Sequence, residues 1–70
     1  MSEIQAVLFK NTKWDSKKSR DWLKKNKYVP IKRVHKTDTF LRYRLKEPNQ
    51  YKRFITKKLG KGIELIIGFK

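Results

Sequence analysis

Alternating apolar and polar positions predict strands near both ends of the chain and in its middle. Between residues 39 and 46 every second residue is apolar, as expected of a strand with one buried face; these residues are Leu41, Tyr43 and Leu45. Residues 63–69 alternate in the same way, through Ile63, Leu65, Ile67 and Phe69. Residues 4–9 form a shorter apolar run that ends at a turn-like segment, and we predict a strand there too.

A helical pattern occupies residues 16–25. Trp22 and Leu23 lie on one side of this segment at helical spacing, so we expect both side chains to point inward. Asp15 precedes the segment, and its carboxylate can accept hydrogen bonds from the first free amides of a helix. Asn26 follows it and is predicted to end the helix in the left-handed conformation.

Weaker signals fill the rest of the chain. Residues 28–34 contain Pro30, which lacks a ladder donor and therefore restricts this segment to a sheet edge or to the start of a strand. Residues 35–38 have the composition of a turn. Residues 51–58 are a further strand candidate, and residues 59–62 form a tight reversal whose glycines permit positive φ.

Together the segments predict an α+β fold, in which one helix packs on a small, mainly antiparallel sheet. The order is strand-helix-strand-strand-strand-strand. No linker, internal repeat or low-complexity block divides the 70 residues. We therefore expect residues 1–70 to form a single basic domain.

Charge narrows the choice of partner. The sequence holds 20 lysines and arginines against 6 acidic residues, a formal net charge of +14. This excess repels itself on a small body, and a polyanion would relieve the repulsion. Nucleic acid is therefore the expected partner, with DNA ahead of RNA, and an anionic membrane or an acidic protein surface comes next.

The sequence has few groups suited to catalysis or metal binding. It has no cysteine, one histidine and six scattered acids, whereas acid–base catalysis needs two groups within reach of one substrate. His35 and Asp38 are better explained by a hydrogen-bonded turn than by a catalytic pair. Residues 60–62 lack most of a phosphate-binding loop. We expect a protein that is not an enzyme and requires no cofactor or metal.

Hydropathy bears on location. The longest apolar run, residues 63–69, contains Glu64 and is far shorter than a membrane span. The first residues do not have the pattern of a secretory signal. The expectation is an intracellular protein that is neither secreted nor membrane-spanning, with association with a virion left open.

The alternating strand at residues 39–46 is the first candidate surface for phosphates. Its polar face would carry Phe40, Arg42, Arg44 and Lys46. An aromatic ring can stack on a base while guanidinium groups bind phosphates. Packing of Phe40 on Pro30 or under the helix is the alternative for that ring, and neither role is preferred. For Arg42 and Arg44 a binding role is preferred.

Two further basic clusters follow. The second covers the segment before the last strand, with Lys52, Arg53, Lys57, Lys58 and Lys61. Such a run can be a solvated face or can protect a sheet edge, and we favour phosphate contacts because the chain is already far from neutral. The third is on the helix, where Asp21 weakens the signal of Lys17, Lys18, Lys24 and Lys25. Trp14 and Trp22 are expected in the core.

Three segments together resemble a known family: AVLFKNTKWDSKKSRDWLKKNKY, DTFLRYRLKEP and FITKKLGKGIELIIGF. The family is a small uncharacterised domain found in tailed-phage head-associated proteins and in short proteins of large DNA viruses. The resemblance implies a viral origin and no particular activity. Asp15 stands where similar sequences often have Thr, which preserves a helix cap. The lysine content is higher than in the phage versions, which argues against a head-protein role and for a polyanion partner.

The sequence therefore predicts a non-enzymatic domain that binds nucleic acid mainly through phosphates, with little sequence preference. No recognition helix, zinc finger or RNA-recognition signature is present. The alternative is a virion or host interaction module that docks on an acidic protein surface. Self-association through residues 63–69 is a third reading, because Ile66 suggests burial on both faces of that strand.

Overall fold

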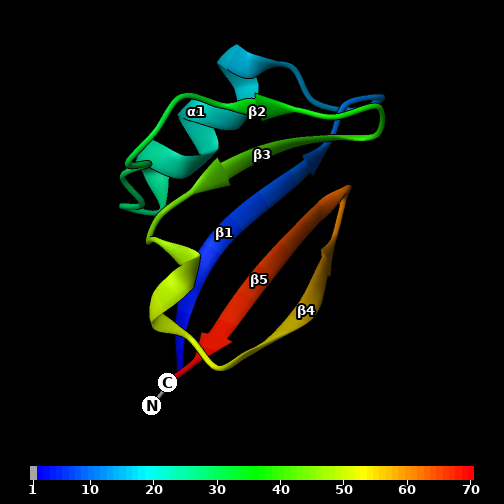
Figure 1. The fold of residues 1–70 in the computed structure, drawn as a ribbon. Helices are drawn as coiled ribbons and strands as arrows, with labels where there is room; N and C mark the ends of the chain where they lie inside the picture. The colour runs from blue at the N-terminus through cyan, green and yellow to red at the C-terminus, as the bar shows by residue number, and fades with distance from the viewer. Residues whose placement is uncertain (1) are drawn as a thin grey trace.

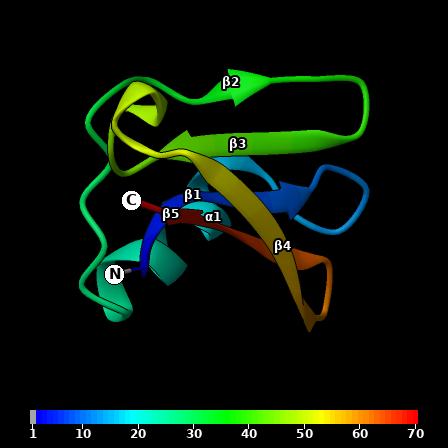
Figure 2. The same ribbon diagram turned by 60° about the horizontal axis from the view of Figure 1, so that its bottom comes forward.

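The structure is a computed structural model and describes residues 2–70 (Figure 1). Its elements are β1 (Ser2–Lys10), α1 (Ser16–Lys25), β2 (His35–Lys36), β3 (Phe40–Arg44), a 3-10 turn η1 (Pro48–Gln50), β4 (Arg53–Gly60) and β5 (Ile63–Phe69). The strands form one antiparallel sheet in the order β2-β3-β1-β5-β4. Figure 2 shows α1 behind this sheet. The predicted α+β class and element order are confirmed.

The core fills the space between α1 and the sheet, and Phe9 of β1 is at its centre. The Phe9 ring lies 5.0 Å from Trp14, 5.5 Å from Trp22 and 5.7 Å from Tyr43, in tilted or edge-on arrangements that aromatic rings favour. Leu23 of the helix is 1% exposed. The other buried apolar members are Val7, Leu41, Ile63 and Leu65. Both tryptophans pack against the core, as predicted.

The start of the helix is fixed by two polar contacts. The Asp15 carboxylate accepts a hydrogen bond from the Lys18 amide at 2.8 Å, which is the predicted cap. Ser19 is buried, and its hydroxyl lies 2.7 Å from the Tyr43 hydroxyl on β3. This pair joins the helix to the sheet through a satisfied polar contact.

The predicted left-handed stop at Asn26 is wrong. Asn26 has φ −94°, and the positive φ of 62° belongs to Lys27. The Lys27 amide donates to the Lys24 carbonyl at 3.1 Å, and the Tyr28 amide donates to the Leu23 carbonyl at 2.9 Å. This pair of bonds puts the left-handed residue one position after the cap.

The predicted strand over residues 28–34 is also wrong. These residues form an irregular loop that crosses from α1 to the sheet edge. Pro30 has no amide hydrogen to donate to a ladder, and the loop is anchored to the sheet instead by the Ile31 amide, which donates to the Arg44 carbonyl at 2.9 Å. The short strand β2 lies within residues 35–38, which had been assigned to a turn.

The observed turn is two residues further along the chain, at residues 37–40. The Thr37 amide donates to the Phe40 carbonyl at 2.8 Å, and the Thr37 hydroxyl accepts from the Phe40 amide at 2.9 Å. His35 and Lys36 are thereby free to pair with Arg42 and Leu41. The turn prediction was correct in kind and two residues early in position.

The reversal between β4 and β5 is confirmed. Gly60, Lys61 and Gly62 all have positive φ, at 83°, 55° and 79°, the backbone that tight hairpins of this hand require. The Trp14 indole donates to the Lys61 carbonyl at 2.7 Å. This bond ties the hairpin turn to the segment that leads into the helix.

The two edges of the sheet differ greatly in length. β2 pairs over two residues at one edge, whereas all eight residues of β4 are exposed at the other. β5 is paired on both sides, with β1 and β4, so self-association through this strand could use only its faces. Within residues 2–70 no helix is long and apolar enough to cross a membrane.

Candidate nucleic-acid interface

The face of the sheet that points away from α1 is called here the open face. Val7, Tyr43 and Leu65 are cross-strand partners and belong to the core, so their neighbours along each strand point to the other side. By this register the open face carries His35 from β2, Phe40, Arg42 and Arg44 from β3, Glu3, Ala6, Leu8 and Lys10 from β1, Glu64, Ile66 and Gly68 from β5, and Phe54, Thr56 and Lys58 from β4.

Arg42 and Arg44 lie on the open face, as the alternation predicted. Their cross-strand partners on β1 are Leu8 and Ala6, so the two side chains start beside an apolar strip, and both are half-buried. Spacing along a strand is about 3.3 Å per residue, which puts their Cα atoms roughly 6.6 Å apart. The two cations therefore form a short row along one strand.

The guanidinium groups of this row make one long hydrogen bond and no ion pair within residues 2–70. Arg42 Nη2 reaches Gln5 Oε1 at 3.5 Å, a long contact. The Nε atoms of both arginines are buried and have no hydrogen-bond partner in the described residues. A buried donor without an acceptor costs about 1–3 kcal/mol. Because these Nε atoms are buried, an oxyanion from solvent would have to bind the outer nitrogens of the guanidinium groups, with charge assistance.

Gln5 is held at this position by a bulge. The register of β1 against β5 shifts between Ile4 and Ala6, which leaves Gln5 as an extra residue. Its side chain is fully buried and donates to the Lys46 carbonyl at 2.8 Å. The bulge therefore fixes the β1 side chain that accepts the long hydrogen bond from Arg42.

Aromatic rings stand at both ends of the open face. Phe40 is paired with Lys10 at one end, and Phe54 is paired with Gly68 at the other. Phe54 is 44% exposed and meets the Tyr51 ring edge-on, at 5.7 Å. Because Phe40 faces away from α1, the alternative that it packs under the helix is wrong.

The second predicted cluster is divided between two faces. Lys58 lies opposite Glu64 on the open face, but Lys57 lies opposite Leu65 and so points to the helix side. Arg53 also points that way, with its guanidinium 4.7 Å from the centre of the Phe69 ring. Lys52 and Lys61 lie in the connections at either end of β4. Strand alternation separates residues that the sequence groups together.

Lys46 is engaged in an ion pair. Its ammonium lies 2.9 Å from the Glu3 carboxylate, and Lys70 lies 2.9 Å from the other oxygen. Hydrogen bonds from Lys70 and then Lys46 lower the pKa of Glu3 from 4.5 to about 2, and the bond to Glu3 raises the pKa of Lys46. Tyr51 donates to Glu3 at 3.3 Å, and burial raises its pKa. Lys46 is therefore less available to a phosphate than Arg42 is.

Sequence reasoning missed Lys10, His35 and Phe54 as members of this face. Lys10 and His35 were assigned to turns, yet they pair with Phe40 and Arg42. Extending the alternation of Val7 and Phe9 by one residue would have placed Lys10 beside Leu8. No comparable signal in the sequence marks His35, because its position depends on a two-residue pairing.

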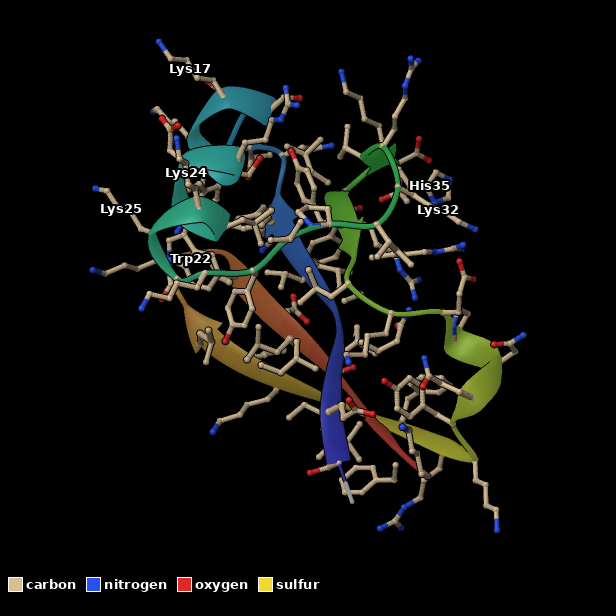
Figure 3. All side chains as sticks on the ribbon, turned by 90° about the vertical axis from the view of Figure 1, so that its left-hand side faces the viewer. Lys17, Trp22, Lys24, Lys25, Lys32 and His35 are labelled. Carbon is tan, nitrogen blue, oxygen red and sulfur yellow. The ribbon has the colours of Figure 1, made fainter. Side chains whose placement is uncertain are left out.

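The helix cations form a separate group. Figure 3 shows Lys17, Lys24 and Lys25 projecting outward from α1, while Trp22 lies toward the sheet. These lysines are on the opposite side of the sheet from Arg42 and Arg44. The third cluster is therefore not part of the open face.

The described residues hold no group of three or more histidines, aspartates or glutamates that could bind a metal ion. The open face offers two cations and a half-buried ring on β3, and an exposed ring on β4 at the opposite edge; rings and cations on one sheet face suit a nucleic acid with unpaired bases. In comparisons with known proteins, no family model, no curated protein and no solved structure matches the chain.

Proposed function

We propose that the chain is a non-enzymatic nucleic-acid-binding domain that acts mainly through phosphate contacts, with little sequence specificity. The observation that carries this proposal is the row of Arg42 and Arg44 on the open face, two half-buried cations that make no ion pair with an acid of residues 2–70. Guanidinium groups bind phosphates in fork geometry, so two unpaired arginines on one strand suit a phosphate backbone. The net charge of +14 adds long-range attraction for a polyanion.

The open face favours a single strand over a duplex. Phe40 shares β3 with Arg42 and Arg44, and Phe54 lies on β4 near the opposite end of the face. Exposed rings contribute to binding by stacking on unpaired bases, which a duplex does not offer. In this arrangement the bases stack on the rings and the backbone follows the arginine row.

The test is a titration of nuclease-treated protein with labelled oligonucleotides, read by fluorescence anisotropy. A thymine single strand and a matched duplex are each titrated at salt concentrations from about 50 to about 200 mM. We expect the single strand to bind more tightly and its affinity to fall steeply with salt, because phosphate binding releases counterions.

The variant Arg42→Ala/Arg44→Ala should lose at least about tenfold in affinity for the single strand. Lys17→Ala/Lys25→Ala removes the same charge from α1 and is the matched control, with an expected loss of about twofold or less. Equal losses in the two variants would reduce the proposal to general electrostatic attraction. Absence of binding at low salt, or tight binding that salt does not weaken, would contradict it.

The alternative is a protein-interaction module that docks on an acidic protein surface, which the same excess of cations supports. A nuclease-resistant complex with one acidic protein would support this alternative, provided that neither oligonucleotide binds. A viral setting for either function is proposed on the family resemblance alone.

A further inference from the structure

A groove lies on the helix side of the molecule, between α1 and the loop of residues 27–34. Its volume is about 810 Å³, and it also reaches Tyr43 of β3. Tyr43 points to the core side of the sheet, so the groove and the open face are on different sides of the molecule. The proposal for Arg42 and Arg44 makes no use of it.

The loop holds exposed apolar side chains in this groove. Val29 is 79% exposed and Ile31 is 49% exposed, and both line the groove with the buried Leu23. Exposed aliphatic side chains next to a buried apolar residue give a surface that gains from being covered.

The loop is held in place at both ends. At the helix end Tyr28 stacks on Trp22, with ring centres 5.9 Å apart, and its amide donates to the Leu23 carbonyl. At the other end the Ile31 amide donates to the Arg44 carbonyl at 2.9 Å. Pro30 restricts the backbone between them. A ligand would therefore meet a largely ordered surface, which reduces the entropy lost on binding.

The residues around the groove are cationic, and none is acidic. Two come from α1 and four from the loop and β2: Arg20, Lys24, Lys27, Lys32, Arg33 and Lys36. In the described structure Lys32 is the one among them with an acidic partner, Glu47 at 3.1 Å, and that pair is half-exposed. Figure 3 shows Lys24 on the helix and Lys32 on the loop, so cations come from both walls.

We propose that this groove binds a peptide segment of a partner protein that carries both acidic and large apolar side chains. The apolar side chains would cover Val29 and Ile31, and the carboxylates would pair with the cationic rim. We call Val29 and Ile31 the apolar floor and the surrounding lysines and arginines the cationic rim. Peptides with both apolar and charged side chains commonly bind grooves of this kind. The site is additional to the open face and does not depend on nucleic-acid binding.

A nucleic acid fits the groove less well than a peptide. Bases bind proteins by stacking on rings, and the apolar side chains offered here are the aliphatic Val29 and Ile31. The Tyr28 ring already stacks on Trp22. Phosphates alone would use the rim and leave the apolar floor uncovered.

The test uses two labelled synthetic peptides and nuclease-treated protein. One peptide alternates glutamate with leucine, and the other has serine in place of each leucine. We expect the leucine peptide to bind at least about tenfold more tightly, because it alone can cover the floor. Equal affinity of the two peptides would overturn the proposal, because binding would then depend only on the cations around the groove and not on Val29 and Ile31.

Substitutions separate this site from the open face. Val29→Ser/Ile31→Ser should remove the preference for the leucine peptide and change oligonucleotide affinity by about twofold or less. Ile55→Ser is the matched control, because Ile55 is 47% exposed on β4 and does not line the groove; it should leave the preference intact. Arg42→Ala/Arg44→Ala should leave peptide affinity unchanged. Loss of oligonucleotide affinity in Val29→Ser/Ile31→Ser would assign the groove to nucleic acid instead.

A titration of the unmodified protein, followed by NMR, provides a measurement that does not depend on variants. The leucine peptide should shift the methyl resonances of Val29 and Ile31 and leave the Phe40 ring unchanged. Shifts confined to the open face would overturn the proposal.

Discussion

Gly68 lies on the open face at a position with no room for a side chain. A Cβ added there would lie 2.5 Å from Cγ of Tyr51 and within 2.8 Å of both Cδ atoms. Tyr51 is 8% exposed and is held by Phe54 and Glu3, so its ring has little room to move. The position therefore requires the absence of a side chain more than it requires any special backbone angle.

Gly68→Ala should lower the free energy of unfolding by about 1–3 kcal/mol, the usual cost of overpacking. Urea denaturation of the single and double variants measures the effect. In Gly68→Ala/Tyr51→Ala the clash is gone, so the double variant should lose less stability than the sum of the two single variants. Strict additivity would show that the ring and the methyl group do not meet.

The sequence predicted the orientation of a side chain correctly where that orientation depends on a single strand. Arg42 and Arg44 were placed correctly on the polar face because alternation within β3 is sufficient to orient them. It did not place Arg53 and Lys57, whose orientation depends on the register of β4 against β5. Nor could it find Gln5, because a bulge depends on a mismatch between two strands.

At the scale of elements, the end of α1 has the wrong residue for its conformation. Lys27 adopts φ 62°, a region that costs L-residues about 1–2 kcal/mol and is normally occupied by glycine. Asn26, one residue earlier, has an ordinary φ, and its side-chain amide donates to the Trp22 carbonyl at 2.8 Å. Position 27 therefore favours glycine, whereas position 26 favours a side chain that can donate a hydrogen bond.

Lys27→Gly should therefore raise the free energy of unfolding by about 0.5–1 kcal/mol, since relief of the strained φ outweighs the greater freedom of glycine in the unfolded chain. Asn26→Gly, the matched control, should lower it, because a hydrogen bond is lost and no strain is relieved. Thermal unfolding of both variants provides the measurement. A loss of stability in Lys27→Gly would show that Lys27 makes a compensating contact.

The helix and the sheet strands were mostly predictable as elements, and the loop of residues 28–34 was not. The helix bounds Ser16–Lys25 match the prediction, because the Asp15 cap fixes the start and the apolar spacing fixes the extent. Val29, Ile31 and Val34 have strand-like composition, but the strand pairing they suggested would have to include Pro30. The chain instead uses them in a loop anchored at Tyr28 and Ile31, a tertiary arrangement that no local pattern indicates.

At the scale of the whole molecule, Glu3 is where the start and the end of the chain are joined. Its carboxylate pairs with Lys70 after β5 and with Lys46 after β3, and the beginning of β1 lies beside the end of β5, where Ser2 pairs with Phe69 (Figure 1). In a chain of charge +14, an acid between two cations relieves repulsion at this end of the sheet. Protonation of Glu3 would remove that relief.

The pH dependence of this contribution has a definite sign. The pKa of Glu3 is about 2 in the folded protein against 4.5 for the free group, so its contribution is fully present above pH 4.5. It is lost as the pH falls through about 2. We expect the urea midpoint to decrease over this range, and Glu3→Gln to show a flatter decrease.

Glu64→Gln is the control for that experiment. Among residues 2–70 Glu64 makes no ion pair, so its removal should leave the slope of the decrease nearly unchanged. A Glu3→Gln variant with the same slope as the unmodified protein would show that other carboxylates govern the acid response.

The distribution of charge over the molecule was predictable only in part. Excess charge indicated a polyanion or an acidic surface, but it did not show that α1 and the sheet divide the cations between opposite sides of the molecule. That division depends on which sheet face the helix covers, and the core around Phe9 and Leu23 decides it.

The unequal edges of the sheet limit how copies of this chain can join. The exposed edge of β4 is eight residues long, whereas β2 offers only two paired residues at the opposite edge. Continuous filaments built by strand addition need two usable edges on every copy. If two copies paired through their β4 edges, neither would retain a long free edge. Strand addition would therefore stop at a dimer.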